Sequence, residues 1–180
     1  LDLAQPVAPT LDTPGSPTPL PSVMTSRLEK VMLRALEAHG NQEFEEAINL
    51  YTQLLGMKLE RAIRSLVYNH RGLAYVATGD SRRALRDFSM AIEYGPGSER
   101  GYLNRAICLS REKKFAAALD DFDRAIGLNP CLAHAYFGGA RARYERQEPT
   151  LALADCEKAL DIQAEHLPAK ELLKLLKRSI

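Results

Sequence analysis

The chain has 180 residues, of which 46% are hydrophobic and 26% charged, and its 24 basic and 23 acidic residues give a net charge of +1. This composition is ordinary for a globular protein of about one domain. It excludes the basic field that a binder of phosphate backbones needs, so we expect no nucleic-acid partner. No run approaches the roughly 20 apolar residues of a transmembrane helix, and we expect no membrane span.

Residues 1–24 are predicted to be a flexible tail or linker rich in Pro and Thr. Six of the ten prolines lie in the first 22 residues, and such a segment buries too little apolar area to offset the entropy of ordering it. Its only charged residues are Asp2 and Asp12. A start at Leu1 without methionine fits an exported, periplasmic protein whose signal peptide was removed, and fits a cytoplasmic fragment nearly as well.

From Ser26 onward the pattern is helical. Ser26 and Glu29 form a capping-box pair ahead of an apolar run. Proline is then absent until Pro96, and apolar residues recur at three- and four-residue spacing. Neither sustained alternation nor an Asn-Gly or Asp-Gly turn indicates a strand. We therefore predict an all-α fold for the rest of the chain.

A period of 34 residues runs through this helical part. Shifting the chain by 34 superposes Tyr68 on Tyr102, the pair Asp87-Phe88 on Asp121-Phe122, and Pro96 on Pro130, and looser copies precede and follow these two segments. Small residues recur at three positions of the period and allow close approach of helix axes, while rings at two other positions fill the space between the helices. At two of the small positions the residues are Ala35, Gly72, Ala106 and Ala140, and Ala47, Ala84, Ala118 and Ala152.

These residues and their spacing resemble the tetratricopeptide repeat, a helix-turn-helix unit. The resemblance implies an all-α, right-handed superhelical α-α solenoid. We predict four repeats, at residues 28–64, 65–98, 99–132 and 133–166, and a C-terminal capping helix at residues 167–180. The first repeat is longer than 34 residues, which predicts a long first helix in the second repeat. In the last repeat Arg143 stands where an apolar residue is expected.

The resemblance also implies a function, since most members of the family are adaptors. We expect a non-catalytic protein–protein interaction module, a scaffold that binds an extended or helical peptide of a partner protein in its concave groove. The first helix of each repeat lines this groove. The groove residues so implied are Asn69, His70, Leu73, Arg100, Leu103, Asn104, Ile107, Arg111, His134, Phe137, Arg141 and Tyr144. Their amides and arginines suit peptide backbones and carboxylates, and the apolar members suit anchor side chains.

Two further interpretations concern the occupant of the groove. The tail, through Asp2 and Asp12, could dock against the groove arginines within one chain or between two chains, which would give autoinhibition or a homo-oligomer. The co-chaperone branch of the family grips a C-terminal carboxylate with lysine, asparagine and arginine. At those positions this chain has Met32, Leu36, His70, Arg100 and Asn104, so the resemblance does not extend to chaperone-tail clamping. In its general sequence features the chain is more similar to the repeat arrays of bacterial proteins.

Few residues offer catalytic chemistry. Gly79-Asp80-Ser81 resembles the start of a serine-hydrolase block, but it falls at the turn within a repeat, where Gly bends the chain and Asp or Ser caps the next helix. The four histidines and three cysteines lack the spacing of a metal site, and we expect buried or half-buried cysteines, no metal, no cofactor and no enzyme. The recurrent Asp87, Asp121 and Asp155, with Arg34, Arg71 and Arg105, are predicted to form ion pairs between packed helices.

Overall fold

The computed structural model describes residues 26–179, and the predicted tail at residues 1–24 lies outside this part. The described residues form nine helices and no strand. The helices are α1 (Arg27–Gly40), α2 (Phe44–Leu55), α3 (Arg61–Ala77), α4 (Ser81–Tyr94), α5 (Glu99–Arg111), α6 (Phe115–Leu128), α7 (Ala133–Glu145), α8 (Pro149–Ile162) and α9 (Leu167–Ser179). The prediction of an all-α fold is confirmed.

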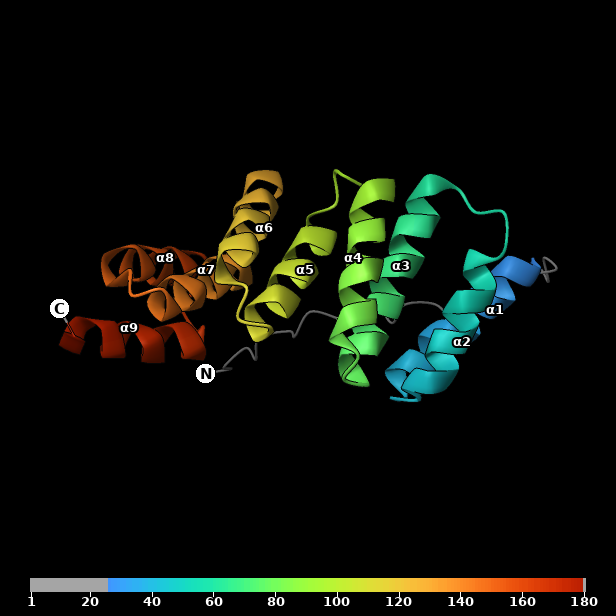
Figure 1. Ribbon diagram of the computed structural model, residues 1–180, viewed down its shortest axis with the longest axis horizontal. Helices are drawn as coiled ribbons and strands as arrows, with labels where there is room; N and C mark the ends of the chain where they lie inside the picture. The colour runs from blue at the N-terminus through green and yellow to red at the C-terminus, as the bar shows by residue number, and fades with distance from the viewer. Residues whose placement is uncertain (1–25, 180) are drawn as a thin grey trace, which may run out of the picture.

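The helices stack in chain order into an elongated array of pairs, with α1 at one end and α9 at the other (Figure 1). Each helix packs against the one before it and the one after it. The odd-numbered helices also contact one another, α3 with α5, α5 with α7, and α7 with α9. The even-numbered helices of the described part have no comparable contacts among themselves. The array is therefore a solenoid whose odd-numbered helices form the inner layer.

The turn within each helix pair has the same backbone conformation in all four pairs. Its central residue has a positive φ, +63° at Gln42, +82° at Gly79, +58° at Lys113 and +61° at Gln147. Glycine adopts this left-handed region without steric cost, whereas the other three residues do so only because the packed helices hold the turn. The sequence marks just one of these four turns with glycine.

Each helix pair has its own apolar core around one large buried side chain. Tyr51, Phe88, Phe122 and Cys156 are buried at equivalent points of the four pairs. Alanines on both helices of each pair surround them and are almost entirely buried, so the helices approach closely around each ring. A ring in the first three pairs and a smaller cysteine in the fourth make the cores unequal in size.

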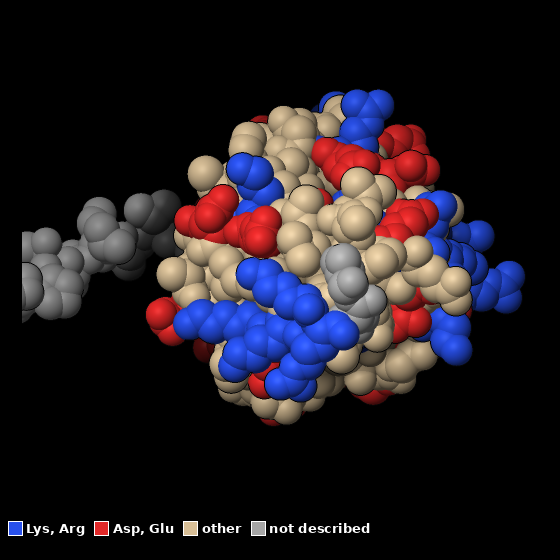
Figure 2. All heavy atoms as spheres, turned by 90° about the vertical axis from the view of Figure 1, so that its left-hand side faces the viewer, with Lys and Arg blue, Asp and Glu red and all other residues tan. Residues whose placement is uncertain are grey.

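Helix α9 covers the last pair. Its Leu172, Leu173 and Leu176 pack against the core around Cys156, whereas Leu175 on the same helix is 44% exposed. Figure 2 looks at this end of the molecule and shows Lys and Arg side chains gathered there. Lys177 and Arg178 lie in the last turn, where cations complement the helix dipole. Within the described residues no helix is long and apolar enough to cross a membrane.

Three details of the sequence interpretation can be compared with the helices. Helix α3 has 17 residues, against 13 for α5 and α7, as the long first repeat predicts. It begins at Arg61, so residue 65, the predicted start of the second repeat, lies within it. The prediction of buried or half-buried cysteines is wrong for Cys131, which follows Pro130 between α6 and α7 and is exposed, while Cys108 and Cys156 are buried.

Candidate functional site

The twelve residues implied for the groove all lie on three odd-numbered helices. Three are on α3, five on α5 and four on α7. Residues three or four positions apart share one face of a helix, so each set forms a row. We call the exposed side of α1, α3, α5 and α7 the inner surface. His134, Arg100, Ile107, Arg111, Arg141 and Tyr144 are exposed, and Leu73, Leu103, Asn104, His70 and Phe137 are half-buried.

Asn69 differs from the rest because it is buried. Its side-chain Oδ1 accepts a hydrogen bond of 2.9 Å from Nδ2 of Asn104. The two residues lie on α3 and α5, so the bond links neighbouring repeats. A buried amide needs such a partner to offset its lost hydration. This pair therefore belongs at least in part to the packing of the solenoid.

His70 also packs between repeats. Its ring stacks on Tyr51 with centroids 5.9 Å apart and lies 6.0 Å from the ring of His39. Burial lowers the pKa of His70, and the nearby His39 and Arg100 lower it further. His70 thus favours the neutral imidazole form and helps to join α3 to the first pair of helices.

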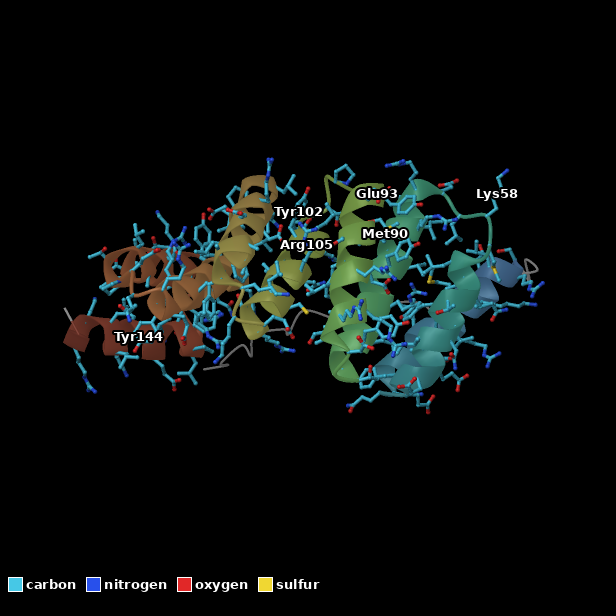
Figure 3. The ribbon with its side chains drawn as sticks, viewed as in Figure 1. Lys58, Met90, Glu93, Tyr102, Arg105 and Tyr144 are labelled. Carbon is cyan, nitrogen blue, oxygen red and sulfur yellow. The ribbon has the colours of Figure 1, made fainter. Side chains whose placement is uncertain are left out.

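One group of arginines is engaged in ion pairs inside the solenoid. Arg71 donates from Nε and a terminal nitrogen to both carboxylate oxygens of Asp87, at 2.7 and 2.9 Å. Arg105, labelled in Figure 3, binds Asp121 in the same way at 2.7 and 2.8 Å. Bidentate pairs of this kind are strong and directional. The predicted ion pairs between helices are confirmed for these two repeats.

The other two repeats form the ion pair differently. In the last repeat Gly139 occupies the position of Arg71 and Arg105, and Arg143, one helical turn later, reaches back to Asp155. This explains a charged residue where the repeat pattern predicts an apolar one. In the first repeat Arg34 pairs with the exposed Glu46 at 3.1 Å, because Leu50 stands where the later repeats have aspartate.

A second group of arginines has no such partner. Arg100, Arg111 and Arg141 are exposed on the inner surface, and no ion pair within the described residues involves them. Arg141 lies with its guanidinium carbon 5.9 Å from the centroid of the Phe137 ring. These three side chains are therefore available to carboxylates from outside the helical array.

A cavity of about 420 Å³ opens between α5 and α7, with α6 behind it. Five of the predicted groove residues line it, namely Ile107, Arg111, His134, Phe137 and Arg141. Phe115, Phe122, Gly138 and Ala142 supply further apolar wall, and Ser110, Lys113 and Glu145 supply polar rim. The structure thus brings together an apolar recess and two of the three unpaired arginines. Asn69, His70 and Leu73 lie apart from it on α3.

Sequence reasoning missed several exposed apolar residues of the inner surface. Leu33 and Leu36 on α1 are 63% and 41% exposed, and Leu66 on α3 is 39% exposed. In the repeat register Leu33 matches Asn104, Leu36 matches Ile107 and Leu66 matches Arg100. The signal was present in that register, but the groove prediction left out the first repeat and, in the second repeat, Leu66. The inner surface is therefore apolar toward α1 and basic toward α7.

The hydrolase-like segment is a turn, as predicted. Gly79 has the positive φ of the turn, and the side chain of Asp80 caps α4 by accepting a 2.9 Å hydrogen bond from the Arg83 amide. A cavity of about 730 Å³ beside it has mostly charged and polar walls, and neither histidine nor cysteine lines it. Within the described residues no group of His, Cys, Asp and Glu could hold a metal ion.

Comparison with known sequences identifies one family. The tetratricopeptide repeat model matches residues 70–131 and 112–166. The chain is 32% identical over 104 residues to human serine/threonine-protein phosphatase 5 and 34% identical over 111 residues to mouse WD and tetratricopeptide repeats protein 1. These matches cover 58% and 60% of this chain but 20% and 16% of the two relatives. The chain thus spans about a fifth or less of their length.

Several solved structures have the same architecture. YrrB, a tetratricopeptide protein with an unusual peptide-binding site, aligns with a TM-score of 0.73 at 20% identity, over 84% of this chain and 76% of its own. MamA aligns with a TM-score of 0.75 at 20% identity, over 84% and 81%. The first repeat domain of Spaghetti (RPAP3), bound to the HSP90 peptide SRMEEVD, aligns with a TM-score of 0.65 at 26% identity, over 66% and 94%. The predicted helical repeat solenoid is confirmed.

Proposed function

Because the chain belongs to the tetratricopeptide repeat family, a family of protein-interaction modules, we propose that it binds a peptide segment of a partner protein on its inner surface. The segment lies along α3, α5 and α7, and no chemistry is performed on it. The phosphatase activity named for one relative is not part of this proposal, because the match covers only 20% of that protein.

The division of the arginines supports this function above all. Arg71, Arg105 and Arg143 satisfy the internal aspartates, whereas Arg100, Arg111 and Arg141 are exposed together on the inner surface. Arg111 and Arg141 line the same cavity, and exposed guanidinium groups are stabilised when an external anion pairs with them. Peptide carboxylates, from acidic side chains or a chain end, meet this need.

The test is a pull-down with the full chain, read by mass spectrometry. One variant carries Arg100→Glu, Arg111→Glu and Arg141→Glu. Its matched control carries Arg82→Glu, Arg86→Glu and Arg124→Glu, which reverse three exposed arginines on α4 and α6 and change the net charge equally. We expect a partner that the wild type and the control capture and the inner-surface variant loses. Circular dichroism confirms that all three proteins are equally helical.

Asn69 and Asn104 are unsuitable for this test. Because their side chains bond to each other between α3 and α5, substituting either one disturbs the solenoid as well as any ligand contact. Capture that survives in the inner-surface variant, or that is lost equally in the control, contradicts the proposal.

A second candidate function is docking of the chain's own residues 1–24 on the same surface. The observation that favours it is charge, since that segment contains Asp2 and Asp12 and no basic residue. It predicts that deleting residues 1–24 either changes the molecular mass in solution or strengthens peptide binding. A deletion that changes neither one contradicts it.

A further inference from the structure

We propose that the cavity between α5 and α7 is a specificity pocket for one large apolar side chain of the ligand. In the ligand sequence, acidic residues flank this apolar residue on both sides. This inference rests on the proposed function and specifies the chemistry of the partner segment. We call this cavity, lined by the residues given above, the α5–α7 pocket.

The size and walls of the pocket define the side chain that it accepts. Its volume of about 420 Å³ lies near the lower end of the range of about 300–1,000 Å³ that is usual for ligand sites. Ile107 and Phe137 stand on the facing helices α5 and α7, and Phe115 and Phe122 on α6 supply the back. Such a space fits a single aromatic or leucine-sized side chain, and buried aromatic anchors dominate the binding energy of many interfaces.

The pocket exists because the last repeat has Gly138 at this place on its inner surface. In the repeat register its counterparts are Leu33, His70 and Asn104, all of which have side chains. A Cβ atom on residue 138 would overlap the ring of Phe122. Glycine therefore lets that ring come up against the backbone of α7 and form the floor of the pocket. The recess thus lies at the junction of the last two repeats, where Gly138 occurs.

The charges around the pocket select the residues next to the anchor. Arg111, Lys113 and Arg141 line it, against one acidic residue, Glu145. Arg111 and Arg141 form no ion pair within the described helices. Arg141 already lies near the Phe137 ring, so a ligand ring seated beside Phe137 gains from the same cation. Acidic flanks are attracted to this rim and basic flanks are repelled.

The binding experiment uses the full chain and labelled peptides. Fluorescence anisotropy compares the peptide GSDEFEDSG with GSDEAEDSG, which lacks the anchor, and with GSNQFQNSG, which lacks the charges. We expect each change to weaken binding by about tenfold or more, and added salt to weaken only the acidic peptides. Equal binding of all three peptides, or no binding of GSDEFEDSG, overturns the proposal.

A charge-exchange experiment assigns the binding to this pocket. Arg111→Glu combined with Arg141→Glu should weaken GSDEFEDSG by about tenfold or more and improve the basic peptide GSKKFKKSG. The matched control, Arg86→Glu combined with Arg124→Glu, has the same net charge but alters exposed arginines on α4 and α6. If the control behaves like the pocket variant, the attraction is nonspecific and the proposal is wrong.

Failure of the pocket can be told apart from failure of the proposed function. If the pull-down partner depends on the inner-surface arginines while GSDEFEDSG does not bind, the function stands and the pocket chemistry is wrong. If SRMEEVD, the peptide bound to the Spaghetti domain, binds more tightly than GSDEFEDSG and is unaffected by the pocket variant, the ligand is recognised elsewhere by its chain end. That result also overturns the pocket.

Discussion

Asp87 shows how a single charged residue is accommodated inside this solenoid. It is buried between α3 and α4, and both of its carboxylate oxygens accept hydrogen bonds from Arg71. Arg71 also donates to the Thr52 hydroxyl at 2.9 Å, which extends the network to the preceding repeat. A buried ion pair is no guarantee of stability, but removing one partner leaves the other without compensation for its lost hydration.

We therefore expect Asp87→Ala to lower the free energy of unfolding by about 3 kcal/mol. Urea denaturation followed by circular dichroism measures this change. In the control, Arg71→Met combined with Asp87→Leu, both charges are replaced by apolar groups and the loss should be clearly smaller. A single substitution that costs no more than the double one would show that the ion pair is already well hydrated.

The ion pairs also show what can be read from the sequence at this scale. Arginine and aspartate recur after 34 residues, Arg71 as Arg105 and Asp87 as Asp121, and this recurrence predicted the two ion pairs. It could not predict that Arg143 replaces the missing arginine, because that depends on the space left beside Gly139. The Asn69–Asn104 bond was missed for a similar reason, since a residue on the groove-facing side of one helix can turn toward the next.

At the scale of helices, glycine residues allow an aromatic ring of one helix to lie against the backbone of a neighbouring helix. Gly72 faces Phe88, and Gly138 faces Phe122, so tightly that a Cβ at either glycine would overlap the ring. The recurrence of small and aromatic residues predicted this kind of contact in general terms. It did not predict the left-handed turns at Gln42, Lys113 and Gln147, because there the conformation is imposed by the packed helices and not by the residue type.

Gly138→Ala tests the approach of α6 to α7. Alanine favours a helix over glycine by up to about 1 kcal/mol, but overlap with a buried ring costs about 1–3 kcal/mol, so we expect net destabilisation of about 1–2 kcal/mol. The matched control is Gly127→Ala in α6, where a Cβ meets nothing within 4 Å, and this change should leave stability unchanged or raise it. Thermal unfolding compares the stability of both variants with that of the wild type. Stabilisation by both substitutions would mean that the Phe122 ring moves aside.

At the scale of the whole molecule, the array couples only neighbours. The core around Tyr51 and the core around Cys156 share no residue, and the extensive helix contacts among the described residues join helices that are adjacent or next but one in the chain. In such a solenoid stability is close to a sum over repeats and their interfaces. The inner surface inherits this property, since its apolar end on α1 and its basic end on α7 belong to different repeats.

Leu176→Ala tests this coupling because Leu176 is fully buried where α9 covers the last pair. Loss of a buried leucine costs about 3 kcal/mol. We expect this loss to accelerate hydrogen exchange of the most protected amides in α7, α8 and α9 by about 100-fold. Exchange in α1, α2 and α3 should stay the same, because their cores do not include α9.

The control for this experiment is Leu175→Ala on the same helix, which should have a small effect because Leu175 is 44% exposed. Equal acceleration in all nine described helices would instead mean that the solenoid opens as one cooperative unit. If exchange is accelerated only in α7, α8 and α9, a consequence for binding follows. Because α7 of the last pair forms one wall of the α5–α7 pocket, a loosened α9 should weaken ligands of that pocket before it affects the apolar part of the inner surface on α1.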